Sequence, residues 1–267
     1  MKNSLIALMS DFGDKDFFVA SIKGVILSTN PSARIIDITH NTPSFDVQAG
    51  AFILYATYKY FPAGTIFLSI VDPGVGSSRR ILLVETQDYF FIAPDNGILT
   101  RVLEVEPVKK IMEITNPKFF LPQPSSTFEG RDKMAPAAAW LSKGVSAEEF
   151  GNEVNDFIKI TVHKPRKIKN KIEGQILYID RFGNGITNIP INMLRHFKRS
   201  CQSKVLSLQV RNIKISSFKK NYACVNKGES IFLEGSLGLI EVSAMEGSAA
   251  KKLGFKTGDK VIIQTAG

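Results

Sequence analysis

The stretch that most constrains the fold is an apolar run that stops at an acid, a proline and two glycines. Residues 65–71 (TIFLSIV) have the length and β-branched content of a buried strand, and Asp72 follows directly in the sequence DPGVG. The acid therefore lies at the carboxyl end of a strand, the edge where open α/β sheets bind ligands. Arg79 comes seven positions later, so its guanidinium can meet the carboxylate and keep it charged. The alternative is a loop between two strands that carries a surface salt bridge.

Strand and helix patterns alternate on both sides of this run. Strand-like segments cover 5–9 and 33–38, and helical spacing covers 17–27, 45–58, 99–103 and 134–141. This order predicts parallel strands with right-handed crossovers. A hairpin at 81–93 adds antiparallel strands. We expect an α/β N-terminal domain over 1–163, with a mixed, mainly parallel sheet flanked by helices. Asp132 is expected near the N-cap of the last helix.

The character of the chain changes after a basic segment, 164–171 (KPRKIKNK), which reads as a solvated linker. Short strand-like runs then alternate with Gly, Asn and Lys turns, at 174–179, 185–189, 204–210, 213–217, 230–234, 239–244 and 260–265. This spacing predicts an all-β C-terminal domain over 172–267, a small barrel or sandwich.

Composition and charge limit the class of protein. The chain has 267 residues, 44% apolar and 22% charged, which is typical of a folded globular protein. The net charge of +9 raises nucleic-acid binding as a function, but much of the excess lies in the basic segment and no recognition motif accompanies it. Nucleic-acid binding is therefore the least favoured function.

The sequence gives little sign of a targeting segment, a disulfide framework or a metal site. The first ten residues lack a small-residue cleavage site, so we expect no signal peptide and no membrane span. Cys201 and Cys224 are too few for a disulfide framework, which favours free thiols and a cytoplasmic location. His40, His163 and His196 lie far apart, so no metal site is expected.

Common cofactor fingerprints are missing from the sequence, including the P-loop, the G-x-G-x-x-G turn and the serine nucleophile elbow. An acidic loop instead follows successive strands, with Asp11, Asp72 and Asp95 as members. Each acid alone can be a turn or capping residue. Together they indicate a cationic or hydroxyl-rich ligand.

Five motifs occur in order along the chain: SDFG (10–13), VDPGVG (71–76) with Arg79, APDNG (93–97), TFEGRD (127–132) with APAA (135–138), and IDRFGN (179–184). In this combination the chain resembles the S-adenosyl-L-methionine (SAM) hydroxide adenosyltransferases. These are adenosine-forming SAM hydrolases, related to fluorinase and chlorinase. The resemblance implies an α/β domain, a β-barrel domain and no metal or redox cofactor. It also implies a homotrimer with the active site between one subunit's N-terminal domain and a neighbour's C-terminal domain.

The resemblance also implies residues that bind the substrate. Asp11 would accept the ribose hydroxyls in charge-assisted bonds, and Phe45 would form an aromatic wall beside the ligand. Phe182 would stack on adenine, and Asn184 would serve the methionine or ribose end. The barrel residues that would hold adenosine are Tyr222, Ser236, Glu241 and the backbone around Ala244. For Tyr222 and Ser236 the alternative is barrel packing and a turn hydroxyl.

The resemblance assigns Asp72 and Arg79 to orienting water or hydroxide for attack on the ribose C5′. The halogenating relatives lack this acid, so its presence favours water over halide. Glu129 departs from the pattern, because a His is expected there. It could take a proton from water if crowding against Asp72 raises its pKa, or a second carboxylate could repel the nucleophile and leave a slow enzyme or a binding protein. Met245 also departs, since Asn is more usual. The leading hypothesis is SAM hydrolysis, and the alternative is a non-catalytic adenosine- or SAM-binding protein.

Overall fold

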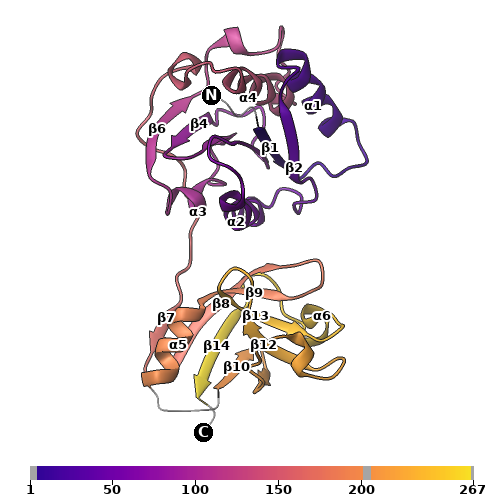
Figure 1. Cartoon of the computed structure of the whole chain (residues 1–267), viewed down its shortest axis with the longest axis vertical. Helices are drawn as coiled ribbons and strands as arrows, with labels where there is room; N and C mark the ends of the chain where they lie inside the picture. Colours follow the sequence, from indigo (N-terminus) through magenta and orange to yellow (C-terminus); the bar gives the residue numbers. More distant parts are fainter. Residues whose placement is uncertain (1–4, 201–205, 266–267) are drawn as a thin grey trace. The chain divides into compact units, whose positions relative to one another are not determined.

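The computed structural model describes residues 5–200 and 206–265. Two compact units make up the chain, Met1–Thr161 and Val162–Gly267 (Figure 1). Of the two cysteines, Cys224 is a free, exposed thiol and Cys201 lies outside the described residues.

The first unit is built on a six-stranded sheet of order β2-β1-β3-β5-β4-β6. Its strands are β1 (Leu5–Ser10), β2 (Arg34–Thr39), β3 (Ile66–Ile70), β4 (Ile81–Thr86), β5 (Phe90–Pro94) and β6 (Val108–Glu113). Its helices are α1 (Phe18–Thr29), α2 (Val47–Thr57), α3 (Thr100–Leu103) and α4 (Ala135–Ser142), with 3₁₀ turns at Tyr58–Tyr60, Pro117–Phe119 and Ala147–Phe150 and a π-helical turn at Gly130–Met134. Only β4 runs against its neighbours, so the sheet is mixed and mainly parallel, as predicted.

Strand alternation sends apolar side chains to both faces of this sheet, so helices must cover both faces. Figure 1 shows α1 and α4 on one face and α2 and α3 on the other. Ile6 and Leu68 pack toward α1 and α4, whereas Ala7 and Phe67 pack toward α2. All four side chains are fully buried. The unit is therefore a three-layer α/β/α structure.

The strand order places a topological switch point between β1 and β3. From β1 the chain crosses through α1 to β2 on one side, and then through α2 to β3 on the other. Ser10 pairs with Ile70 at the carboxyl ends of the two strands. Loops that leave adjacent parallel strands in opposite directions open a crevice, which is where ligands bind in such sheets. Asp11 lies at the start of the loop after β1, and Asp72 lies at the start of the loop after β3.

The second unit is an antiparallel sheet of order β11-β10-β14-β8-β9-β13-β12, with β7 paired to β8. Its elements are β7 (Arg166–Ile168), β8 (Lys171–Ile179), β9 (Gly185–Pro190), α5 (Ile191–Ser200), β10 (Leu206–Val210), β11 (Ile213–Ile215), a 3₁₀ turn at Tyr222–Cys224, β12 (Ser230–Glu234), β13 (Leu239–Ala244), α6 (Ala249–Leu253) and β14 (Lys260–Thr265).

The sheet of the second unit curls until its two ends nearly meet. The chain after β11 returns to β12, where Phe232 N donates to the Ser217 carbonyl and Lys219 N donates to the Phe232 carbonyl. The enclosed core contains fully buried Ile172, Val242 and Ile263. The predicted fold class, an α/β domain followed by a β-barrel, is confirmed.

The structure differs from the sequence predictions in several places. The basic segment 164–171 contains β7, which pairs with the start of β8 in register Lys167–Ile172. Helix α5 was not predicted, although Ile191, Leu194 and Phe197 form its buried stripe. Helix α6 and strand β6 were not predicted either. Asp132, expected near an N-cap, lies in the π-helical turn two residues before Met134, the N-cap of α4, and it accepts a bond from Ser125 N.

Within the described residues, no helix combines the length and apolar character needed to cross a membrane. The same residues contain no group of three or more His, Cys, Asp or Glu side chains placed to hold a metal ion.

A glycine in the turn after β5 allows a close chain contact. Gly97 has φ +94, and a Cβ there would lie 2.6 Å from Ile160 Cγ2 and 2.9 Å from Ile160 N. Gly144 has nearly the same φ, +95, but a Cβ there would have no atom of the described residues within 4 Å. We expect both alanine variants to lose about 1 kcal/mol for backbone strain and Gly97→Ala to lose about 1–3 kcal/mol more for the clash. Urea unfolding of the two variants measures this difference, and equal losses would show that the segment at Ile160 yields freely.

Candidate active site

Four charged side chains gather beyond the carboxyl end of β3: Asp72, Arg79, Glu129 and Lys133, called here the charged cluster. Arg79 Nε donates to both Asp72 oxygens at 2.7 and 2.8 Å, and its Nη2 reaches Asp72 Oδ2 at 2.5 Å and Glu129 Oε2 at 2.5 Å. Lys133 Nζ donates to Glu129 Oε1. The side chains of Arg79, Asp72 and Glu129 are only 6–8% exposed. The surface salt bridge that the loop alone allowed is therefore a buried one.

Two loops hold the charged cluster in place. Gly76 has φ +78, and a Cβ there would lie 2.6 Å from the Ser126 carbonyl oxygen, so the 72–79 loop packs directly on the segment before Glu129. Gly130 lies against Ile70 of β3, with 3.1 Å from its Cβ position to Ile70 Cγ2. The contact at Gly76 requires a residue without a side chain, and at Gly130 a side chain would have to displace Ile70 by a few tenths of an ångström. The charged cluster is therefore fixed to the end of the central strand.

Burial and pairing act in opposite directions on these charges. Burial raises the pKa of Glu129, but the bond from Lys133 and the charge of Arg79 outweigh it and hold this pKa below its usual range. Burial lowers the pKa of Arg79, but Asp72 and then Glu129 raise it above its ordinary value. The hypothesis that crowding raises the pKa of Glu129 is therefore wrong, because two cations contact its carboxylate. Two acids and two bases leave the charged cluster formally neutral.

Asp11 and Phe45 come together beside the switch point. Phe45 N donates to Asp11 Oδ2 at 2.8 Å, and Phe45 is 72% exposed. Phe45 has φ +64, an uncommon conformation for a residue with a side chain. Phe12, next to Asp11, contacts the ring of Phe128 edge to face, with centroids 5.8 Å apart. The Asp11 loop therefore adjoins the segment that carries Glu129.

Six predicted binding residues line one cavity of about 740 Å³ in the second unit. They are Phe182, Asn184, Tyr222, Ser236, Glu241 and Ala244. Met245, the residue that departs from the family pattern, also lines it. Phe182 is 76% exposed, so its ring is available to stack on a planar ligand.

Asp180 shapes the turn that presents Phe182 and Asn184. Its Oδ1 accepts from Phe182 N at 2.9 Å and from Asn184 N at 2.8 Å, and its Oδ2 accepts from Asn184 Nδ2 at 3.0 Å. Gly183 has φ +84 and lies so close to Ser248 that no side chain fits there. The turn is therefore fixed on both sides.

A buried acid of β13, Glu241, also lines the cavity. Glu241 Oε1 accepts from Tyr222 OH at 2.5 Å and from Ser243 Oγ at 2.7 Å. Burial, with a further contribution from the hydrogen bond to Glu241, raises the pKa of Tyr222 to about 12. Tyr222 is thus a neutral donor throughout the physiological range.

The third acidic loop has a structural role. Asp95 is 4% exposed, and Arg80 Nε and Nη2 donate to its Oδ2 while Ile158 N donates to its Oδ1. Both oxygens are occupied by the protein itself. The expectation that Asp95 faces a ligand beside Asp11 and Asp72 receives no support from these contacts.

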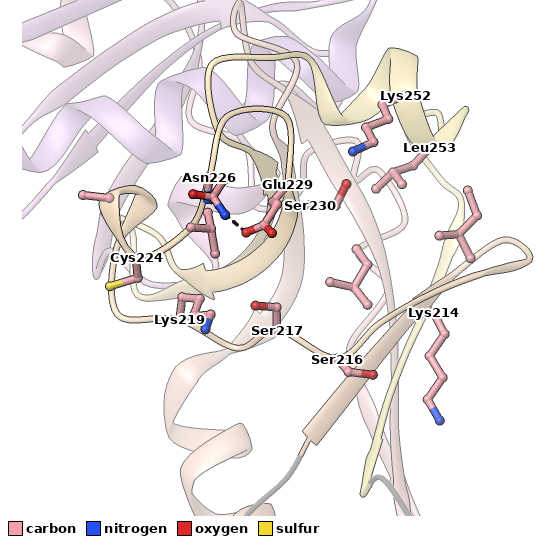
Figure 2. A pocket seen from close by; sticks show the side chains of 14 residues that line it. Lys214, Ser216, Ser217, Lys219, Cys224, Asn226, Glu229, Ser230, Lys252 and Leu253 are labelled. Carbon is pink, nitrogen blue, oxygen red and sulfur yellow. Dashed lines mark hydrogen bonds between the residues drawn. The ribbon is translucent and has the colours of Figure 1, made fainter.

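A second cavity of the barrel unit, about 900 Å³, contains none of the predicted residues. Lys214, Lys219 and Lys252 are among its lining residues, and Figure 2 shows them on different sides of it. Lys252 Nζ donates to the Gly228 carbonyl. Because the amino groups do not converge, this cavity offers no comparable set of functional groups.

Sequence reasoning assigned no role to Lys133 or Asp180. Lys133 could have been found from its spacing, because residues four apart on a helical turn are neighbours and Glu129–Lys133 is an acid–base pair. Asp180 lies inside a quoted motif, and an acid two and four residues before the groups it binds is a common turn pattern.

A buried charged cluster at a switch point, and a barrel cavity edged by an exposed aromatic ring, are typical of a protein that acts on a small organic molecule. Both units match known domains. Residues 6–151 match the SAM hydroxide adenosyltransferase N-terminal domain, and residues 174–262 match the C-terminal domain of the same family. The chain belongs to the SAM hydroxide adenosyltransferase family, as its motifs predicted.

Individual proteins are similar to this chain over most of their length. A Thermus thermophilus protein named (R)-S-adenosyl-L-methionine hydrolase is 31% identical over 95% of this chain and 96% of its own. A fluorinase from an Actinoplanes species is 31% identical over 70% of this chain and 72% of its own. The crystal structure of an uncharacterized conserved protein from Thermotoga maritima is 36% identical, with a TM-score of 0.91 over 97% of this chain and 99% of that one.

Asp132 gives a testable pH dependence of stability. Burial raises the pKa of Asp132, but the hydrogen bonds from Arg131 and the Ser125 amide lower it by more. The pKa therefore lies below its ordinary value of 3.8. The stabilisation is therefore present above about pH 4 and is lost as the pH falls through the folded-state pKa. We expect Asp132→Asn to cost about 1–3 kcal/mol at pH 7 and less near pH 3. Urea unfolding at both pH values checks this, with exposed Asp14→Asn as the control; a cost that does not change with pH would contradict it.

Proposed function

We propose that the chain hydrolyses S-adenosyl-L-methionine to adenosine and L-methionine, the activity for which its Thermus thermophilus relative is named. The observation that carries the proposal is the buried Asp72–Arg79 pair at the end of β3. In the reaction the oxygen of water bonds to the ribose C5′, the C5′–S bond breaks with its electrons on sulfur, and one proton is released. The sulfonium becomes the neutral thioether of methionine.

The charged cluster fits this reaction because a sulfonium is already a good leaving group. The protein then has to place the nucleophile in line with the C5′–S bond and favour its anionic form. Asp72 and Arg79 are proposed to do this: a carboxylate accepts the hydrogen of water, and a guanidinium stabilises negative charge on its oxygen. Glu129 is ionised and contacted by two cations, so its proposed role is to hold Arg79.

The ribose and its surroundings are proposed to bind in the first unit. The Asp11 carboxylate would accept the ribose hydroxyls, and its bond from Phe45 N holds it in a fixed orientation. The exposed ring of Phe45 would form a wall beside the ligand.

The adenine is proposed to bind in the barrel cavity. Phe182 would stack on the base, and Asn184 would serve the methionine or ribose end. Tyr222, Ser236, Glu241 and the backbone at Ala244 would hold adenosine. The supporting observation is that all these residues line the same cavity.

The remaining proposals concern assembly and surroundings. We propose a homotrimer in which one subunit's N-terminal domain and a neighbour's barrel complete each site, and a cytoplasmic location. We also propose that the reaction uses no metal or redox cofactor, because the substrate carries its own leaving group. The division of the ligand residues between two units supports the shared site.

The non-catalytic alternative is less favoured. Its motivation is Glu129, but the lysine at position 133 balances this acid and leaves the Asp72–Arg79 pair intact. The full-length relative named as a hydrolase also favours catalysis.

The direct test is chromatography of the purified protein incubated with SAM. We expect adenosine and methionine in equal amounts from wild type and a loss of at least about 100-fold from Asp72→Asn, which keeps the shape but removes the charge. Asp72→Asn should still bind adenosine in calorimetry. Adenosine binding by wild type with no product above the enzyme-free control would establish the non-catalytic alternative.

A second prediction concerns the turn at Phe182. Asp180→Ala removes three hydrogen bonds that order Phe182 and Asn184, so adenosine should bind about tenfold or more weakly. Asp259→Ala is the matched control, because Asp259 orders another turn of the same unit through Lys256 N. Titration calorimetry with adenosine measures both. Equal affinity in the two variants would contradict a role for this turn.

A further inference from the structure

Lys133 forms the outer end of the charged cluster. It lies one turn after Glu129, in the π-helical turn Gly130–Met134, and its ammonium contacts Glu129 Oε1 while Arg79 contacts Glu129 Oε2. The Lys133 side chain is 28% exposed, against 7% for Glu129. Each oxygen of the buried carboxylate therefore has its own cation. Lys133 comes from the π-helical turn, and Arg79 comes from the loop after β3.

The charges show why the second cation matters. Asp72, Arg79 and Glu129 alone carry a net charge of −1 in a buried location, where an unbalanced charge is costly. With Lys133 the set is neutral. Without it, Glu129 could relieve the imbalance by taking up a proton, and its hold on Arg79 would weaken.

We propose that Lys133 is a positioning residue that keeps Glu129 a permanent carboxylate, so that Glu129 anchors Arg79 toward Asp72 and is not the base that receives a proton from water. This inference rests on the proposed hydrolysis, because it describes how the same site is prepared for that reaction. It also accounts for a carboxylate at a position where the family pattern has a histidine.

The other charges around Glu129 fit this role. Asp72 reaches it only through Arg79, and Arg131 and Asp132 of the same turn pair with each other. The Gly76 amide approaches Glu129 Oε2 at 3.5 Å. The lowered pKa of Glu129 therefore depends on Lys133 and Arg79, and only Lys133 can be changed without removing the partner of Asp72.

The test compares pH profiles of kcat/KM for wild type, Lys133→Met and Lys133→Arg. Losing the cation should raise the pKa of Glu129, so the acid limb should move up by about one pH unit or more in Lys133→Met. Lys133→Arg keeps the charge and should restore the wild-type limb. Lys110→Met, which breaks the exposed Lys110–Glu148 pair of the same unit, should leave the limb in place.

The shift of the acid limb in Lys133→Met is expected to arise from the protonation of Glu129. In the Glu129→Gln background, Lys133→Met should therefore cause no further shift of the limb. An unshifted limb in Lys133→Met, or an equal shift in Lys133→Arg, would overturn the proposal. Lys133→Gln repeats the test if Lys133→Met does not fold, as judged by circular dichroism.

A direct titration separates this inference from the proposed activity. The ¹³C carboxyl signal of Glu129, assigned by its loss in Glu129→Gln, should titrate at higher pH in Lys133→Met than in wild type. An unchanged titration overturns the role of Lys133 whatever the activity. No adenosine from wild type, together with a shifted titration, overturns the hydrolysis and the positioning role built on it while leaving the charge coupling established.

Discussion

A buried guanidinium between two carboxylates is the interaction on which the site depends. Removing Arg79, Asp72 and Glu129 from water is costly, and hydrogen bonds repay this cost only when every charge has a well-placed partner. The partners come from two loops that are far apart in sequence. The close approaches at Gly76 and Gly130 bring these loops together and fix them to β3. The same loop contacts that pack against the end of β3 therefore also bring the charged side chains of the site together.

Much of the fold could be predicted because its signals are local. The apolar run of β3 ends at Asp72, and a strand with both faces buried has few polar positions, so its end is visible in the sequence. Asp72 and Arg79 lie on one short loop, which made their contact predictable. The barrel strands were visible from alternation and turn residues. Helix α5 was not predicted, although Ile191, Leu194 and Phe197 mark its face, because a single short helix among many strand-like runs gives a weak periodic signal.

The electrostatics of the site could not be predicted from local signals. Whether the pKa of Glu129 rises or falls depends on which charges reach it in space, and the sequence hypothesis counted Asp72 but not Lys133. The basic segment 164–171 was read as a linker from its charge, yet Lys167 Nζ bonds to Ser200 Oγ and its strand pairs with β8. Long basic side chains can flank a sheet edge while their charges stay in water. Composition alone does not separate these cases.

The exposed rings of Phe45 and Phe182 have a thermodynamic consequence. Each is more than two-thirds accessible, so water covers a large apolar area on both residues. A nucleoside that stacks on such rings returns this water to bulk solvent, and the removal of apolar surface from water lowers the heat capacity of the system. The enthalpy of nucleoside binding should therefore become more favourable as the temperature rises. For the binding mode proposed above, the steepness of that change would report how much of each ring the ligand covers.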